Sequence, residues 1–564
     1  MYLRTTKRKN KNGSEVKYYQ LAHNERDSKT KKPVANIIHN FGRSDNLDQD
    51  VLIRLCKSIA KVCGVEVIDN EKNTINKEFN SNNTSDLSSE MDIIKTVELG
   101  TVTVIESLWE KIGIGKTLRK ITKNKKSKVP HERALLAMTA NRLCEPDSKL
   151  GVWDRWLSTV YLPSCNPLNL KNMYEAMDLL YKHKDNIEES VFYYTANLLN
   201  LSVDLIFYDT TTATFSVDDY DLDDDEIRQR GRDKSGGFSV QVVVALAVTQ
   251  DGIPVRCWVL PGNTTDVQTV KKVRTDLRGW NLGRAIFVAD AGMNSEKNRK
   301  ELSKACGKYI LATRMTNVSE IKNKVLSHRG KYKVISENLR AKQVIVGDGE
   351  RRRRYILCYN PREAVRQKKR RNEIIKSLDL EISKHKDKKA TAKWAIDLLA
   401  SKRYKKYLKI NSKKNICIDK QIVRDSERFD GKWVLETNDD TITIEDAASG
   451  YKGLMIIERC FRSLKKTQIK LEPMFHWLDH RIESHIRICV LALLIERVAE
   501  IQLGKTWFQI SRILKDLQAT EFRYSTHSFY RRNKINDSIL KIFKTLDIKE
   551  PNSVLEIKSI NSSA

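Results

Sequence analysis

Four apolar, strand-like runs between residues 201 and 300 constrain the fold more than any other feature of the sequence. The runs span 203–208, 240–248, 253–260 and 285–288, and a helical pattern precedes the last of them. The turn QDGIP at 250–254 is expected to join the second and third runs as a hairpin. A strand, a hairpin of two more, a helix and a further strand predict an α/β domain with a mixed sheet.

The rest of the 564-residue chain divides into segments of distinct character around this block. We expect an N-terminal β-rich module at 1–69, an Asn/Ser-rich linker at 70–92, a helical region at 93–200, a catalytic α/β domain at 201–300 that resumes at 445–503, an insertion at 301–444 and a basic helical C-terminal region at 504–564. The helical region suits a helix-turn-helix-like reader of DNA ends. A helical packing domain with a solvated basic loop is the alternative.

Basic residues far outnumber acidic ones. The chain has 102 Lys and Arg against 72 Asp and Glu, which gives a formal net charge of +30. Such an excess predicts a polyanionic partner, most often nucleic acid. The ten cysteines are spread singly without a CxxC pair, which supports neither a disulfide framework nor a zinc ribbon.

The sequence also argues against a secreted or membrane protein. The N-terminal MYLRTTKRKNK lacks the apolar segment of a signal peptide. The longest apolar runs fall far short of the roughly 20 residues that span a bilayer. We therefore expect a reduced, cytoplasmic protein with no membrane partner.

Two aspartates each follow a predicted strand. Asp209 closes the strand of LIFYDTTTATFS, and Asp290 follows the apolar run of AIFVADAGMNS. An aspartate at a strand end is commonly a turn or a helix cap, which is the alternative for both. If the two strands are neighbours in one sheet, the carboxylates can bridge a divalent cation, and a third carboxylate would complete a two-metal site.

The third carboxylate is expected on the helix that contains ASGYKGLMIIERCFRSLKK. Three- and four-residue steps place one set of side chains on a shared face of this helix: Tyr451, Leu454, Glu458, Arg462 and Lys465. Within its apolar surroundings, Glu458 can point toward the sheet. The alternative is an ordinary amphipathic helix with an ion pair between Glu458 and Arg462.

These segments together resemble the DDE transposases of bacterial insertion sequences, in particular the insertion-sequence-four group and its close relatives. The resemblance rests on YDTTTATF, GIPVRCWVLPGNTTD, VADAGM and the spacing Tyr451-x6-Glu458-x6-Lys465, and it covers about residues 200 to 490. The family carries an arginine three residues after the tyrosine, where this chain has Leu454. Arg459 and Arg462 are the candidates to supply that phosphate contact.

The resemblance implies a ribonuclease H-like catalytic core with a long α+β insertion, flanked by a helical N-terminal region and a small β-module. It implies that Asp209, Asp290 and Glu458 are catalytic and bind two Mg²⁺ ions, for which Mn²⁺ can substitute. Tyr451 and Lys465 would hold phosphates of the transposon end. This family works in the bacterial cytoplasm, in association with the nucleoid.

The insertion carries two tryptophans among basic residues, Trp394 and Trp433. In relatives, an insertion-domain tryptophan stacks on a base turned out of the duplex, and either residue is a candidate for that role. A place in the protein core is the alternative for each.

The activity that the resemblance implies is DNA transposition of the cut-and-paste type. The protein would bind the terminal inverted repeats as a homodimer, cleave double-stranded DNA with metal ions and transfer the ends to target DNA. Two alternatives remain: a ribonuclease H-like nuclease without strand transfer, and a non-catalytic DNA-binding protein from a decayed or domesticated element. The three intact carboxylates argue against a decayed element, whereas Leu454 leaves room for one.

Other polar clusters are assigned to surface or packing roles. The arginine runs 351–354 and 366–371 suit phosphate contacts or a solvated face. His476, His480 and His485, near Glu483, have the four-residue spacing of a helical zinc site but not the order HExxH. A packed helix is the favoured interpretation.

Overall fold

The computed structural model describes most of the chain. The described residues are 2–9, 15–26, 33–43, 91–123, 129–215, 226–233, 236–282, 284–316, 318–384, 392–411, 415–524 and 527–559. They form two compact units, Met1–Ser89 and Glu90–Ala564. The first unit has a three-stranded antiparallel sheet, in the order β1 (Tyr2–Lys9), β2 (Glu15–Arg26) and β3 (Pro33–Arg43). Residues 70–90 of the expected linker lie outside the described residues.

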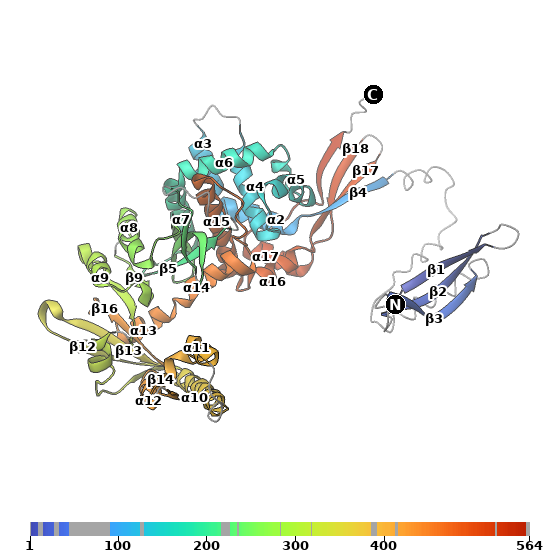
Figure 1. The fold of residues 1–564 in the computed structure, drawn as a ribbon. Coiled ribbons are helices and arrows are strands. Elements are labelled where there is room, and N and C mark those ends of the chain that lie inside the picture. The colour runs from blue at the N-terminus through green and yellow to red at the C-terminus, as the bar shows by residue number, and fades with distance from the viewer. Residues whose placement is uncertain are drawn as a thin grey trace. The chain divides into compact units, whose positions relative to one another are not determined.

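A ten-stranded mixed sheet is the centre of the second unit (Figure 1). Its strands are β5 (Leu205–Thr214), β6 (Gln229–Arg232), β7 (Phe238–Thr249), β8 (Pro254–Pro261), β9 (Ile286–Ala289), β10 (Tyr309–Thr313), β11 (Lys333–Ser336), β12 (Leu339–Val346), β13 (Arg353–Tyr359) and β16 (Lys432–Thr437). They run in the order β11-β12-β13-β16-β10-β9-β5-β7-β6, and β8 also pairs with β7. β5, β7 and β8 are antiparallel neighbours, whereas β9 is parallel to β5 and β10.

The tight turn between β7 and β8 follows from its sequence. Gly252 has a φ of 79°, a backbone conformation that favours glycine. The predicted hairpin at 250–254 is therefore present, with Leu246 opposite Cys257 in its register.

Helices cover both faces of the sheet, and alternate side chains of each strand enter separate cores. One core contains Phe207 and Val288 and receives α13 (Ile444–Lys452), α14 (Met455–Arg462) and α15 (Asp479–Leu503). The other contains Tyr208 and Ala289 and receives α8 (Asp266–Gly279). Burial on both faces explains why these strands are almost continuously apolar.

The helical region packs around α15. It comprises α2 (Gly100–Lys111), α3 (Ile114–Thr122), α4 (His131–Cys144), α5 (Lys149–Asp154), α6 (Leu170–Lys182) and α7 (Lys184–Leu199). Both α4 and α6 contact α15, which is buried over most of its length (Figure 1). Among the described helices, none combines the length and the apolar character needed to cross a membrane.

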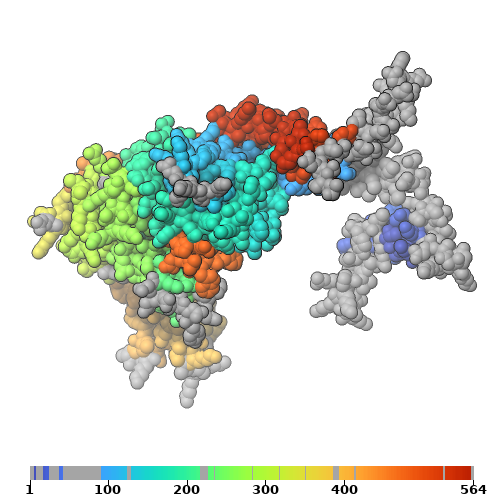
Figure 2. Space-filling view, turned by 90° about the horizontal axis from the view of Figure 1, so that it is seen from above, coloured from blue at the N-terminus to red at the C-terminus, as the bar shows by residue number. Residues whose placement is uncertain are grey.

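The segment expected as an insertion, 301–444, belongs in large part to the central sheet. β10 extends the sheet beyond β9, and β16 pairs with both β10 and β13. A lobe projects from the sheet between β13 and β16 (Figures 1 and 2). It consists of α10 (Pro361–Ser383), α11 (Ala392–Ala400), β14 (Leu408–Ile410), β15 (Ile416–Ile418) and α12 (Lys420–Glu427), packed around Leu378, Leu398, Tyr407 and Leu408.

The C-terminal region 504–564 is not the purely helical segment that the sequence predicts. It contains α16 (Trp507–Leu514), β17 (Gln518–Tyr524), β18 (His527–Arg532), α17 (Asp537–Thr545) and β19 (Val554–Ser559). β4 (Met91–Glu98), expected as the end of the linker and the start of a helix, joins them in the order β19-β18-β17-β4. The rings of Phe522 and Phe529 stack with centroids 5.4 Å apart across β17 and β18. The high charge of these segments hid an alternating, strand-like pattern.

Candidate functional site

Asp209 and Asp290 lie side by side at one edge of the first core. Tyr208 and Ala289 are the last pair in the parallel register of β5 and β9, and Asp290 directly follows β9. Asp209 does not close its strand as the sequence predicts: it lies in the middle of β5, which continues to Thr214 in its pairing with β7. Asp290 keeps an extended backbone, with φ −77° and ψ 169°. Because side chains alternate along extended chains, both carboxylates point to the face that α13 and α14 cover.

Tyr451 connects these aspartates to Glu458. Its hydroxyl donates a hydrogen bond to Oδ1 of Asp290 at 3.2 Å. Burial raises the pKa of Tyr451 well above its ordinary value, and the negative charges of Asp290, Glu458 and Asp209 raise it further. Asp290 therefore contacts Tyr451 directly, and the negative charges of Asp209 and Glu458 act on the same hydroxyl.

The donor chemistry of this cluster suits a hard divalent cation, because all three side chains offer oxygen ligands. Asp209 is half-buried, and Asp290 and Glu458 are exposed. Among the described residues, however, no three His, Cys, Asp or Glu side chains are arranged to hold one metal ion. The carboxylates are gathered but do not form a closed ligand set.

Lys465 ties the segment after α14 to the strand of Asp209. Its Nζ donates to the backbone oxygen of Thr212 at 2.6 Å and lies 3.6 Å from Oε1 of Glu472. The same Glu472 oxygen accepts from the backbone N–H of Thr214 at 2.7 Å and from its hydroxyl at 3.0 Å. Lys465 is thus held by protein groups, and Glu472 is a site residue for which the sequence offers no signal.

Leu454 is an apolar core residue. Its side chain is 8% exposed and packs in the first core. An arginine at this position would bury its guanidinium, so the phosphate contact of the family needs another source. Arg459 lies 3.3 Å from Glu500, whereas Arg462, one turn beyond Glu458, is exposed.

The aspartate at the end of the GNTTD motif is a second site residue that the sequence analysis did not single out. Oδ1 of Asp266 accepts a hydrogen bond from the hydroxyl of Thr210 at 2.5 Å. Thr210 is buried directly after Asp209. A Cβ placed on Gly292 would lie 3.4 Å from Oδ2 of Asp266, so this side chain also borders the turn that follows Asp290. Asp266 therefore anchors Thr210, next to Asp209, and lies near the turn after Asp290.

Two family models match the chain. The IS1634 family transposase N-terminal domain matches residues 3–71, and the transposase DDE domain matches 214–495, which is half of the chain. The chain belongs to the DDE transposases. The matched DDE range includes Asp290 and Glu458 and begins beyond Asp209. The resemblance to the DDE transposases of bacterial insertion sequences is therefore confirmed.

Comparisons with individual proteins give a distant similarity to a solved structure. A cryo-EM structure of the piggyBac transposase synaptic complex with hairpin DNA is similar at 10% sequence identity with a TM-score of 0.32, covering 74% of this chain and 79% of that chain. No curated protein matches the sequence. From its family, the protein is a DNA transposase and an enzyme of the DDE type, whose partner is DNA. DDE transposase domains generally use divalent metal ions.

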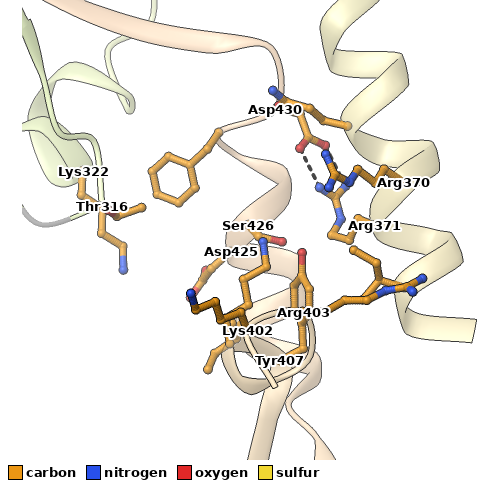
Figure 3. A pocket seen from close by; sticks show the side chains of 15 residues that line it. Thr316, Lys322, Arg370, Arg371, Lys402, Arg403, Tyr407, Asp425, Ser426 and Asp430 are labelled. Carbon is orange, nitrogen blue, oxygen red and sulfur yellow. Dashed lines mark hydrogen bonds and ion pairs between the residues drawn. The ribbon is translucent and has the colours of Figure 1, made fainter. Parts of the chain in front are cut away.

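The lobe of the transposase contains a basic pocket of about 960 Å³ (Figure 3). Its cationic lining comprises Lys322, Arg370, Arg371, Lys402, Arg403 and Lys406. Arg371 is buried and makes two hydrogen bonds to Asp430, at 2.6 and 2.7 Å. Arg354 is also buried, and its Nη2 donates to the backbone oxygen of Ile442 at 2.8 Å. One arginine of each predicted phosphate-contacting run, Arg354 and Arg371, is thus buried and bonded within the protein.

Both tryptophans of the predicted insertion have packing contacts in the transposase. Trp433 lies on β16, and its half-buried ring packs against the first core. Trp394 lies on α11, and its half-buried ring packs against the core of the lobe. These contacts fit the alternative interpretation of each tryptophan, a place in the protein core.

The three histidines near α15 have different surroundings. His480 Nε2 lies 3.1 Å from Asp178, and Glu483 pairs with Lys184 at 2.8 Å. His485 is buried under α5 beside Lys149. The structure thus has the packed helix that the sequence analysis favoured over a zinc site.

Proposed function

We propose that this transposase binds the terminal inverted repeats of its element, cleaves the DNA ends and transfers them to target DNA in a cut-and-paste reaction. The observation that carries the proposal is that Asp209 and Asp290 come from neighbouring strands, with Tyr451 bonded to Asp290 and Glu458 on the next helix, α14. The fold proposed for the core is ribonuclease H-like. Its support is the mixed sheet, in which an antiparallel set of three strands is followed by two parallel strands with helical crossovers.

The proposed site holds two Mg²⁺ ions through the three carboxylates. Bound ions of this kind activate a water molecule or a DNA 3′-hydroxyl and stabilise the leaving oxygen. Asp209 and Asp290 already lie on neighbouring strands, so Glu458 must approach them to complete the ligand set. Asp266 would help to hold Thr210, and with it the backbone next to Asp209, in place.

Phosphates of the DNA end are assigned to three side chains. Tyr451 would donate its hydroxyl to a phosphate, and Lys465 would exchange its present acceptors for one. Arg462 takes the contact that Leu454 cannot make, because it is exposed one turn beyond Glu458. Neither tryptophan is included, because both rings pack in apolar clusters.

The proposed assembly is a homodimer on DNA. Joining requires that the two ends of the element be held together, and one active site faces one scissile strand at a time. The basic pocket of the lobe supplies an additional positive surface for the DNA (Figure 3).

Cleavage of a plasmid that carries the native flanks of the gene tests the proposal. Purified protein with Mg²⁺ should cut at inverted repeats, and joined products should follow. Asp209→Asn should remove the cuts, whereas Asp440→Asn, at an exposed ion pair with Arg352, should leave them unchanged. Cuts without joined products would favour a nuclease, and binding without metal-dependent cuts would favour a non-catalytic DNA-binding protein.

A further inference from the structure

A second cavity, of about 600 Å³, has Glu472, the partner of Lys465, in its wall. It is enclosed by the start of α5, the end of α4 and the segment that leads into α15. In Figure 2 this orange segment lies against the cyan-to-teal helical region. Exposed Leu150 and Phe475 form part of the rim. Through Glu472, the cavity therefore adjoins the residues that lead to Asp209.

Lys149 is buried in this wall, with 3% of its surface exposed. Its Nζ lies 3.3 Å from Nδ1 of His485. Nε2 of His485 lies 3.1 Å from the backbone oxygen of Leu471, which only accepts, so Nε2 carries the proton and Nδ1 accepts from Lys149. The ammonium of Lys149 thus has a neutral imidazole as its partner.

Arg142 adds a second buried cation to the same wall, with 4% of its surface exposed. Its Nη1 donates to the backbone oxygen of Lys470 at 3.2 Å and its Nη2 to Oδ1 of Asn141 at 3.5 Å, whereas its Nε has no hydrogen-bond partner among the described residues. The acidic residues of the wall are engaged elsewhere. Asp147 pairs with Arg155 at 2.7 Å, and Glu472 receives Thr214 and Lys465.

Two buried cations without a direct ion pair are destabilising in the empty protein, because the charge of Asp147 near Arg142 offsets desolvation only in part. Burial and the charge of Arg142 lower the pKa of Lys149 to about 7. Burial and the same positive groups lower the pKa of His476, which also lines the cavity, to about 3. The cavity thus combines space, a positive potential and hydrogen-bond donors that lack acceptors.

We propose that this cavity binds a phosphate group through Lys149 and Arg142. An arginine fork and a lysine ammonium are the donors that phosphate oxygens accept from most strongly. On DNA the ligand would be a backbone phosphate beyond the one that Lys465 contacts, and this assignment rests on the proposed function. A free phosphate anion has the same chemistry, so the experiment has one arm for each source.

Inorganic phosphate is the probe of the first arm, with ionic strength held constant by sodium chloride. The melting temperature of the wild-type protein should rise with phosphate, because the ligand binds only the folded state. Lys149→Met should abolish this rise. Lys184→Met is the matched control: Lys184 has a carboxylate partner, Glu483, at 2.8 Å, and the rise should persist in that variant.

The variants should also differ in stability without phosphate. Lys149→Met should keep or raise the melting temperature, because it removes a buried charge that lacks a counter-ion. Lys184→Met should lower it, because Glu483 loses a partner. A lysine with a purely structural role would give a lower melting temperature in Lys149→Met and an unchanged response to phosphate, which would overturn the proposal.

Duplex DNA of the terminal repeat is the probe of the second arm. Lys149→Met should reduce the slope of log affinity against log salt by about one unit, as expected for one lost phosphate contact. A reduced slope assigns the cavity to a backbone phosphate. A lost response to inorganic phosphate with an unchanged DNA slope assigns it to a free anion.

Arg142→Met provides an independent test if Lys149→Met does not fold. The proposal is overturned if wild-type protein shows no response to phosphate and neither variant changes the DNA slope. Neither arm measures cleavage. Failure of phosphate binding therefore counts against the cavity alone, whereas absence of cutting counts against the proposed function alone.

Discussion

The hydroxyl of Tyr451 donates to Oδ1 of Asp290 across 161 positions of sequence. The bond joins α13, the helix directly before the α14 helix of Glu458, to the end of β9, which lies beside the strand of Asp209. It also occupies one oxygen of Asp290 that a metal ion would use. The same tyrosine therefore assembles the carboxylates and competes with the ion for one of them.

This competition predicts opposite effects of Tyr451→Phe on metal and on DNA. Loss of one hydrogen bond to Asp290, worth about 1 kcal/mol, should increase the apparent affinity for Mn²⁺ by about fivefold. Affinity for the DNA end should fall, because a phosphate donor is lost. Titration of cleavage with Mn²⁺ and a separate DNA-binding assay without metal would measure the two effects; a decrease in both would contradict the competition.

The three carboxylates should be individually essential for cutting. Asp209→Asn, Asp290→Asn and Glu458→Gln should each reduce cleavage by at least about a thousandfold, since a bound metal stabilises the transition state by several kcal/mol. DNA binding should remain largely intact in each variant. Near-normal cleavage by any of them would remove that residue from the site.

Lys465 should contribute one phosphate contact once its protein acceptors are exchanged. Lys465→Ala should reduce the slope of log affinity against log salt for the DNA end by about one unit. The neighbouring Lys466 is exposed. Among the described residues, its side chain makes no hydrogen bond to β5 like that of Lys465 to Thr212. Lys466→Ala serves as the control, and equal slopes for the two variants would refute a specific contact of Lys465.

The hydrogen bond between Thr210 and Asp266 should stabilise the protein as well as the site. Thr210→Val keeps the shape but leaves Oδ1 of Asp266 without this donor, which should cost about 1 to 3 kcal/mol in the free energy of unfolding. Cleavage should fall while DNA affinity stays constant. Urea unfolding measures the first effect. Thr275→Val, at an exposed hydroxyl on α8, should change neither quantity.

Glu496 should make stability depend on pH. Burial raises its pKa to about 7, although the hydroxyl of Ser463 contacts both carboxylate oxygens, at 2.7 and 2.6 Å. The folded protein binds this proton more tightly than the unfolded chain, so its contribution is present below pH 4.5 and is lost as pH rises through 7. Glu496→Gln should match wild type at low pH and exceed it by up to about 3 kcal/mol at pH 8. Denaturant unfolding across this pH range gives the comparison; a constant difference would contradict the shift.

The sequence predicted the parts of the site that lie in continuous motifs. The apolar runs around Asp209 and before Asp290, and the spacing from Tyr451 to Lys465, were sufficient to single them out. Two details were wrong: β5 continues past Asp209, and the single predicted helix is divided between α13, which carries Tyr451, and α14, which carries Glu458. Asp266 and Glu472 were missed because their roles arise from hydrogen bonds to Thr210 and Thr214, which only the folded chain brings near.

Strand pairing over long distances was equally hidden. β16 continues the central sheet beside β10, although a charged lobe separates them in sequence. β17 and β18 carry charged residues between aromatic ones, so their composition indicated helices whereas their alternation fitted strands. The alternation of side chains and the presence of a strand to pair with, rather than amino-acid composition, determine the secondary structure of these segments.

The pairing of β4 with β17 has a consequence for biosynthesis. β4 is the first described strand of the large unit, and its hydrogen-bonded neighbour is made more than 400 residues later, since Thr96 and Thr520 face each other across the pair at a separation of 424. Domains generally fold as they leave the ribosome, from the N-terminus onward. Here the opening strand must wait until β17 (Gln518–Tyr524) has been synthesised, so its sheet can close only after the whole α/β core has left the ribosome.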